Sequence, residues 1–239
     1  MVETAAITPP PVKAAAPVRP RDPAGLAQWL LVALYIDLAA DSLSAVADAL
    51  DLGFVGRIDP DTPASFGEAL PGEGWIGVFQ GLSALAQTLI FLVAGFLCLK
   101  WIYRMSLNAH ALAVAPDMKI SPAWGVGWFF VPFASLWKPF QGVRESWQVS
   151  AASGGPDWHL LPVPGLLRWW WGLWLASNIV GNVSLRLQMN ATTAGELMLS
   201  GSLSLLQDIA NVPLDVLFIF VVRRLTALQV GALSQRVFD

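Results

Sequence analysis

The sequence contains few of the side chains on which catalysis and metal binding most often depend. Its 239 residues include one cysteine, Cys98, together with two histidines and two tyrosines. A single cysteine excludes an intrachain disulfide and a metal site made of several thiolates. The chain also lacks a phosphate-binding glycine loop, a His-Glu-x-x-His zinc motif and a Gly-x-Ser-x-Gly nucleophile motif. We therefore expect no enzymatic activity, no metal and no cofactor.

Charge is scarce as well. Only 13% of the residues are charged and 55% are hydrophobic, with a mean hydropathy of +0.57, whereas soluble domains carry about 25% charged residues. The composition predicts an all-α, polytopic membrane protein. The formal net charge of -3 hides a segregation of basic from acidic residues along the chain, and we expect no nucleic-acid partner.

Five segments are apolar enough to enter a bilayer. Residues 1–24, rich in alanine and proline, precede them and are typical of a disordered tail. A cleavable signal peptide is the weaker interpretation, because the apolar run that would form its core contains Asp37. Crossing about 30 Å of hydrocarbon takes about 20 helical residues. The third segment is short and is interrupted by Pro132; the five segments are residues 26–47, 78–102, 122–136, 169–187 and 203–222.

The basic residues distinguish four spans from five. With four spans and the third segment on the cytoplasmic surface, 12 of the 14 basic residues lie inside, and only Arg57 and Arg186 lie outside. With five spans the basic residues divide evenly, so the positive-inside rule favours four. We therefore expect a single membrane domain over residues 25–230 in a bacterial plasma membrane, with both termini, including the tail 231–239, cytoplasmic. The first external loop is acidic, with Asp51, Asp59, Asp61, Glu68 and Glu73.

Tryptophan is abundant and unevenly placed. Under this topology most tryptophans fall at the cytoplasmic boundary, where an indole ring finds both apolar contacts and a hydrogen-bond partner. This set comprises Trp29, Trp101, Trp124, Trp128, Trp137, Trp147, Trp158, Trp169, Trp170 and Trp171. The two histidines, His110 and His159, are predicted on the same side as solvated surface residues, with a metal site that includes Asp117 as the alternative.

A distinctive motif occupies the middle of the chain. It comprises Arg104 and Asn108, then Ser-Pro-x-Trp at residues 121–124, Gly-Trp-Phe-Phe-Val-Pro at 127–132, and the set Trp137, Pro139, Gln141, Glu145 and Trp147. With its flanks, from about residue 78 to 230, it resembles the bacterial membrane proteins of domain-of-unknown-function family 4328. One departure is Phe129-Phe130, where that family commonly has Trp-Phe. The resemblance implies a bacterial plasma-membrane protein and supplies no activity.

Two prolines define a broken helical hairpin at about residues 121–150. Pro122 can begin a helix, and Pro132 should end or kink it because proline lacks the backbone donor. After the break, Leu136, Phe140, Val143 and Trp147 share one side, opposite Lys138, Gln141, Glu145 and Gln148. This pattern predicts an interfacial amphipathic helix with its basic residues toward anionic headgroups, after a short re-entrant helix around Trp124 and Trp128. The hairpin is either a packing elbow or a gate that contacts a substrate.

Carboxylates occur inside the apolar segments. Asp37, Asp41 and Asp48 lie on one side of the first helix together with Ser44, and Asp208, Asn211 and Asp215 share a face of the last. Counting from the membrane surface, Asp41 and Asp208 lie at similar depth, and so do Asp37 and Asp215. If the faces meet, four carboxylates converge without a cation, so some should be protonated or bind one.

Other polar residues accompany these carboxylates. Gln80 and Gln87 lie in the second span; Asn178 and Asn182 share a face with Gly181, which predicts close helix approach and interhelical hydrogen bonds. Asp37 and Asp215 superficially suit intramembrane aspartyl proteolysis, but the Gly-x-Gly-Asp context of that class is missing.

Two hypotheses of function remain open at this point. The first is a small proton- or cation-linked transporter, channel or accessory subunit that uses an ion site formed by Asp37, Asp41, Asp208, Asn211, Asp215, Asn178 and Asn182. The second is a non-catalytic scaffold or lipid-interacting protein whose aspartates serve packing. The lipid bilayer is the one partner that the sequence indicates; it specifies neither a protein partner nor an oligomeric state.

Overall fold

A computed structural model describes residues 20–65, 74–114 and 118–238, and the regular structure in these ranges is helical. The helices are α1 (Ala24–Val55), α2 (Trp75–Leu112), α3 (Pro122–Gly127), α4 (Lys138–Ala151), α5 (Gly165–Asn190) and α6 (Ala194–Phe238), with short 3-10 turns η1 (Trp128–Phe130), η2 (Ala134–Leu136) and η3 (Trp158–Leu160). The all-α class is confirmed. Most of the predicted tail 1–24 lies outside the described residues, as do Glu68, Glu73 and Asp117.

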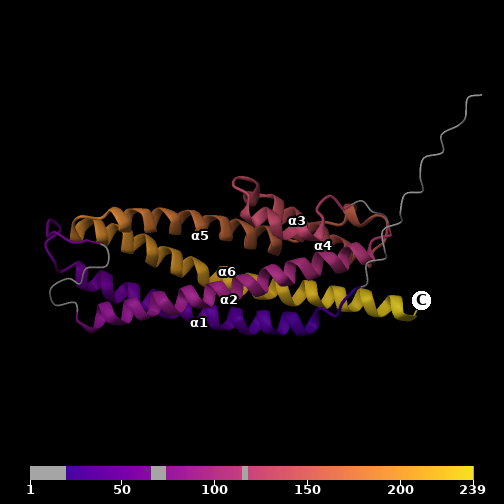
Figure 1. Cartoon of the computed structure of the whole chain (residues 1–239), viewed down its shortest axis with the longest axis horizontal. Helices are drawn as coiled ribbons and strands as arrows, with labels where there is room; N and C mark the ends of the chain where they lie inside the picture. Colours follow the sequence, from indigo (N-terminus) through magenta and orange to yellow (C-terminus); the bar gives the residue numbers. More distant parts are fainter. Residues whose placement is uncertain (1–19, 66–73, 115–117, 239) are drawn as a thin grey trace, which may run out of the picture.

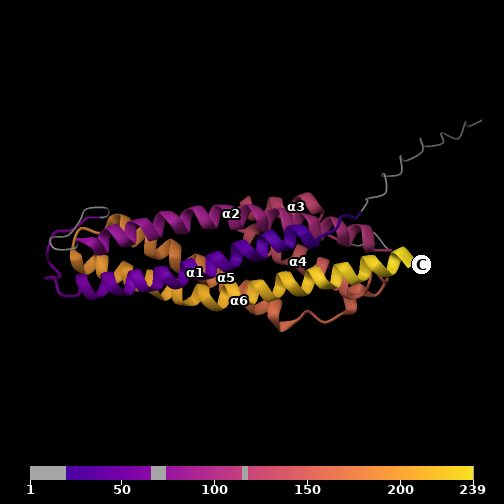
Figure 2. The same ribbon diagram turned by 90° about the horizontal axis from the view of Figure 1, so that it is seen from below.

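Four long helices, α1, α2, α5 and α6, lie side by side along the molecule (Figures 1 and 2). Three of them, α1, α2 and α6, are long and apolar enough to cross a membrane, which indicates a membrane location. The fourth, α5, has 26 residues but carries more polar and indole groups. Helix α6 extends well beyond the predicted span 203–222, continues through Pro213, and includes most of the tail predicted at 231–239.

The long helices pack in a fixed order. Helix α1 packs against α2 and α6, and α6 packs in turn against α5. Helices α2 and α5 are not a closely packed pair within the described residues. At the end of the bundle that we call the hairpin end (residues 118–164), α3 and α4 pack on α2 (Figure 1), and Phe140 and Leu136 reach Trp171 on α5. The opposite end, formed by residues 56–65 and 191–193, is the loop end.

The helical hairpin is interrupted at Pro132, as the sequence predicts. Helix α3 begins with Pro122 and ends at Gly127, and the backbone is extended at Val131 before Pro132. Phe133 then adopts a positive φ of 61°, a conformation uncommon for a side chain of this size. Residues 122–136 therefore form no continuous helix that could span a bilayer.

The polar side of α4 does not face headgroups at Glu145 and Gln148, so that part of the amphipathic prediction is wrong. Glu145 is only 3% exposed, and its Oε2 accepts hydrogen bonds from the backbone N–H groups of Lys119, at 3.1 Å, and Ile120, at 3.2 Å. Gln148 donates to the carbonyl of Leu161 at 2.6 Å. Burial raises the pKa of the Glu145 carboxyl above its ordinary value, and the two backbone donors oppose that shift.

Indole rings fill the hairpin end. Trp101, Trp147, Trp158, Trp170 and Trp171 are buried, whereas Trp29, Trp124, Trp137 and Trp169 are exposed, so the predicted tryptophan boundary is partly a protein core. Two of the buried rings also satisfy their N–H groups: Trp101 donates to Thr226 Oγ1 at 3.2 Å, and Trp171 donates to the carbonyl of Leu136 at 2.8 Å. These bonds tie α2 to α6 and the hairpin to α5.

Arg104 and Asn108, the first residues of the central motif, hold the start of α1. Arg104 donates to the carbonyl of Asp22 at 2.8 Å. Asn108 accepts from the N–H of Arg21 at 2.9 Å and donates to its carbonyl at 2.8 Å. Asn108 also donates to Gln229 on α6 at 3.1 Å. Three separate parts of the chain thus meet at one buried amide.

Candidate functional site

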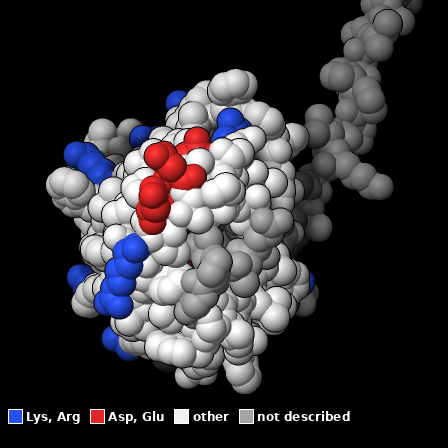
Figure 3. Space-filling model, turned by 90° about the vertical axis from the view of Figure 1, so that its left-hand side faces the viewer, with Lys and Arg blue, Asp and Glu red and all other residues white. Residues whose placement is uncertain are grey.

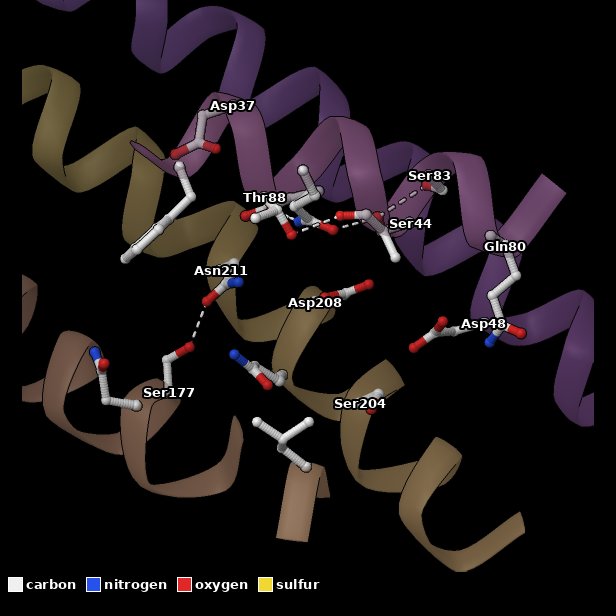
Figure 4. Close-up of a pocket in the computed structure, with 18 of the residues that line it drawn as sticks. Asp37, Ser44, Asp48, Gln80, Ser83, Thr88, Ser177, Ser204, Asp208 and Asn211 are labelled. Carbon is white, nitrogen blue, oxygen red and sulfur yellow. Dashed lines mark hydrogen bonds between the residues drawn. The ribbon is translucent and has the colours of Figure 1, made fainter. Parts of the chain in front are cut away.

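A cavity of about 1230 Å³ lies among the four long helices. Its lining extends from Phe129 and Trp170 near the hairpin to Ser65 and Gly74 at the loop end, and Figure 4 shows part of its polar wall. Side chains of α2 and α5, the two long helices that do not pack closely on each other, face each other across this space. The cavity therefore occupies the part of the bundle that the hairpin leaves unfilled.

The structure brings together the two aspartate stripes. The carboxylates that line the cavity are Asp37, Asp41, Asp48 and Asp51 from α1, and Asp208 and Asp215 from α6. Three of them are buried: Asp41 is 4% exposed, Asp215 7% and Asp208 9%. Among the described residues that line the cavity there is no lysine, arginine or histidine. The site is accordingly acidic, without an internal cation to neutralise it.

The alignment of α1 with α6 agrees with the depths that the sequence predicts for the aspartates of the two helices. The two helices are antiparallel neighbours (Figure 1). Asp215 interacts with Asp41 and Asp37, and Asp208 with Asp41 and Asp48. Because each stripe repeats every three or four residues, it stays on one helix face over about two to three turns. Both stripes therefore contribute to one continuous polar wall.

Hydrogen bonds from α2 hold the α1 stripe. Gln87 donates to Asp41 Oδ1 and accepts from Ser44 Oγ at 2.5 Å. Ser44 also lies 3.2 Å from Ser83 Oγ. Asp215 differs: its Oδ2 is buried and receives no hydrogen bond from an N–H or hydroxyl group among the described residues, and its side chain lies beside the Asp41 carboxyl. Gln87 on α2 therefore holds Asp41, whereas Asp215 Oδ2 on α6 lacks such a donor among the described residues.

The predicted interhelical role of Asn178 and Asn182 is wrong. Asn178 lines the cavity, but its side chain donates to the carbonyl of Trp174 in its own helix at 2.7 Å. Asn182 is exposed and likewise donates to the carbonyl of Asn178 at 2.8 Å. A long amide side chain reaches its own preceding turn as easily as a neighbouring helix. We therefore assign no cross-helix contact to either asparagine.

Serines on α5 make the cross-helix bonds instead. Ser177 donates to Asn211 Oδ1 (Figure 4), and Ser184 donates to the carbonyl of Ser200 at 2.8 Å. Gly181 lies between them, and a Cβ there would collide with the Gln207 amide. The spacing 177, 181, 184 places small residues on one helix face, and this pattern could have identified the contact from the sequence.

Aromatic rings close the cavity toward the hairpin. Phe218 on α6 stacks on Trp170 with 4.9 Å between ring centroids, and Trp171 stacks on Trp174 at 4.7 Å. Phe129, from the turn η1, lies edge-on to Trp174 at 6.1 Å. All five rings line the cavity. The hairpin thus contributes directly to the site, through Phe129.

The other motif residues serve the packing of the hairpin or its outer surface. The Trp124 and Trp128 rings lie 4.6 Å apart, and Lys138 Nζ lies 5.9 Å from the Trp128 ring. Pro139 and Trp147 are buried and Gln141 is half-buried, whereas Trp124, Pro132 and Trp137 are exposed. None of these residues lines the large cavity.

At the loop end, the acidic side chains in view gather in one patch, and basic side chains lie toward the edges (Figure 3). The described segments at this end carry exposed Asp59, Asp61 and Glu196, together with exposed Arg57 and Arg186. The cavity lining reaches the same end at Ser65 and Gly74. The described surface at this end of the cavity therefore carries both signs of charge, with its carboxylates gathered in one patch.

Comparison with known proteins identifies a family and no activity. A family described as "Domain of unknown function (DUF4328)" matches residues 76–227. The chain belongs to this family. The resemblance seen in the central motif is thereby confirmed. The match includes Asp208 and Asp215 on α6 and begins after α1, which contributes the other stripe. No curated protein and no solved structure matches the chain significantly.

Proposed function

We propose that this member of the DUF4328 family is a four-span protein of a bacterial plasma membrane, with both termini cytoplasmic and α5 as the fourth span. At 1.5 Å per residue α5 is about 39 Å long, which exceeds the hydrocarbon thickness of about 30 Å, and it packs along α6. In this arrangement the hairpin end, where Lys100, Arg168, Arg223 and Arg224 are exposed, meets anionic headgroups on the cytoplasmic side.

Single-cysteine labelling in intact cells tests this topology. In a Cys98→Ala background, a cysteine at Asp59 is expected to react with a membrane-impermeant maleimide. Cysteines at Asp157 and Ser234 are expected to react only after permeabilisation. If the cysteine that replaces Asp157 is labelled from outside, the four-span topology is wrong and the hairpin crosses the bilayer.

The proposed activity is the binding of protons or cations by a small transporter, channel or accessory subunit, without an enzymatic step. One observation carries it: Asp41, Asp208 and Asp215 are buried beside one cavity that is lined by no basic residue among those described. Buried charges of one sign are costly unless they are paired or neutralised. A proton or an external cation is the available means of neutralisation.

Thermal stability of the purified protein tests this proposal. The melting temperature of the wild-type protein is expected to change with pH and with added monovalent cations. The variant carrying Asp41→Asn and Asp215→Asn should lose most of that dependence, because the amides need no counter-charge. Asp59→Asn, at an exposed carboxylate of the loop end, is the matched control and should behave as the wild type does.

A scaffold or lipid-interacting role is the second candidate. Its support is the bond from Gln87 to Asp41, which makes one carboxylate part of the contact between α1 and α2. In that case the melting temperature of the double Asp→Asn variant would fall equally under all pH and cation conditions, with the dependence on both left unchanged.

A further inference from the structure

We infer that the cavity binds a monovalent organic cation, with its ammonium group beside Asp215 and its apolar body against the aromatic rings near the hairpin. This inference rests on the proposed cation-binding function and specifies the class of ligand. The geometry of the α5–α6 contact, the size of the cavity and the composition of its two ends support it.

The charged end of the ligand belongs beside Asp215. This side chain is 7% exposed, lines the cavity, and has a buried Oδ2 without a hydrogen-bond partner. Leaving a buried acceptor unpaired is costly, and the site provides no protein cation in the described lining. A quaternary ammonium group beside this carboxylate would balance the charge of the acidic wall without having to donate a hydrogen bond.

A bare metal ion fits the site poorly. The described residues include no group of three or more His, Cys, Asp or Glu side chains arranged to hold a metal ion. The cavity of about 1230 Å³ is also far larger than a bare ion needs and lies somewhat above the range of about 300 to 1,000 Å³ common for small-molecule sites. Its dimensions suit a ligand with an organic body.

Aromatic rings lie at the depth of Asp215. Ser177 on α5 bonds to Asn211 on α6, and these two helices are antiparallel (Figure 1). One turn from that bond, Trp174 on α5 and Asp215 on α6 reach the same level, and both line the cavity. A cation held by Asp215 would therefore lie near the Trp174 indole, whose face attracts positive charge.

The apolar body has its own surface one turn further toward the hairpin. Phe218 follows Asp215 by three residues and therefore shares its face of α6. Its ring is stacked on Trp170, and Phe129 closes the same region from the hairpin. The cavity is thus acidic toward the loop end and aromatic toward the hairpin, which matches a ligand with one charged and one apolar end.

Equilibrium binding with benzyltrimethylammonium tests this inference on the full-length protein in nanodiscs. Neopentylbenzene is its neutral analogue, because a carbon replaces the nitrogen without a change of shape. We expect saturable binding of radiolabelled benzyltrimethylammonium that the unlabelled cation displaces and neopentylbenzene does not. Tetramethylammonium, which lacks the aromatic body, should compete about tenfold more weakly. Equal competition by the neutral compound would overturn the assignment of a cation site.

Variants locate the site. Asp215→Asn and Trp174→Leu are each expected to weaken binding by about tenfold, and Asp59→Asn should leave it unchanged. If Asp215→Asn does not fold, Trp174→Phe and the competition between the two isosteres still decide the question. If neither Asp215→Asn nor Trp174→Leu weakens binding, the cation lies elsewhere and the inference is wrong.

Different outcomes would contradict the organic-cation inference and the cation-binding function. If the wild-type melting temperature responds to pH or sodium through Asp41 and Asp215, and benzyltrimethylammonium does not bind, the organic-cation inference is wrong and the cation-binding function stands. If the double Asp→Asn variant keeps the full dependence on pH and cations, the cation-binding function itself is wrong.

Discussion

The hairpin half and the loop half of this bundle use the same four helices in different ways. In the hairpin half, α3 and α4 pack on α2, Phe140 of α4 reaches Trp171 of α5, and buried indoles such as Trp101 and Trp171 pack there. In the loop half no helix of the described residues lies between α2 and α5, and a cavity with a carboxylate wall lies there. An element packed at one end of a helix bundle can therefore keep two of its helices apart. By holding α2 away from α5 at one end, it leaves an opening along the remainder of their length.

The largest expected loss of stability comes from removing a buried ring of the hairpin half. Trp101 is fully buried, so Trp101→Ala should lower the free energy of unfolding by about 3 to 5 kcal/mol. Chemical denaturation in nanodiscs measures the loss. Trp75→Ala, at a 66% exposed indole of the loop half, is the control and should cost about 0.5 kcal/mol or less. Equal losses at both positions would mean that the two halves do not differ in packing.

Substitution of Glu145 tests whether the buried polar side of α4 holds α3 and α4 in place. Glu145→Ala leaves the N–H groups of Lys119 and Ile120 without their acceptor, which should cost about 1 to 3 kcal/mol. Asp157→Asn, at an exposed carboxylate of the same end, should cost little. Limited proteolysis of the hairpin together with denaturation would detect the change; an unaltered hairpin would contradict the assigned contact.

The same carboxyl group predicts a dependence on pH. Because burial raises the pKa of Glu145 in the folded protein, its protonated form contributes stability that is present at low pH. That contribution is lost as the pH rises through the raised pKa. Between about pH 4 and pH 7, the wild type should therefore lose stability relative to Glu145→Gln. A constant difference between the two proteins over this range would argue against the shift.

Phe129 joins the two halves and should show an intermediate effect. Phe129→Ala removes edge-on contacts with Trp171 and Trp174, each worth about 0.5 to 1.5 kcal/mol. It also removes part of the aromatic wall of the cavity. Phe130→Ala is the matched control, since Phe130 is 73% exposed. Differential scanning fluorimetry should separate the two variants, and identical melting temperatures would exclude Phe129 as the link.

The smallest effect is expected at the serine contacts of the loop half. Ser184→Ala removes the bonds to Ser200 and Ser204, and such interhelical bonds average about 0.6 kcal/mol in membranes. Ser202→Ala removes only a bond within its own helix. Because the difference is small, steric trapping of unfolding is the suitable measurement. A larger loss at Ser202 would reverse the assignment.

Sequence periodicity predicted the helices and the meeting of the two aspartate stripes because both depend on local spacing. The break before α4 was also accessible, since Pro132 imposes it on the backbone. The environment of Glu145 was not, because a helical wheel separates a polar side from an apolar one without showing what that side contacts. Here it contacts backbone donors about 25 residues earlier in the chain.

The bonding of α5 was missed for a related reason. An asparagine such as Asn178 has the same chemistry whether it bonds to its own helix or to a neighbour, and only the relative placement of α5 and α6 decides between them. The orphaned oxygen of Asp215 is likewise a property of the assembled bundle and not of any local pattern.

Pro213 lies inside α6, two residues before Asp215. A proline in this position removes one helical hydrogen bond and permits bending. From Pro213 to Phe238 the helix extends about 37 Å at 1.5 Å per residue. A change of about 10° in the bend would displace the end of the helix by about 6 Å. Thr226 and Gln229 on this segment bond to Trp101 and Asn108 on α2, so a bend at Pro213, beside the acidic wall, would move α2 together with the end of α6.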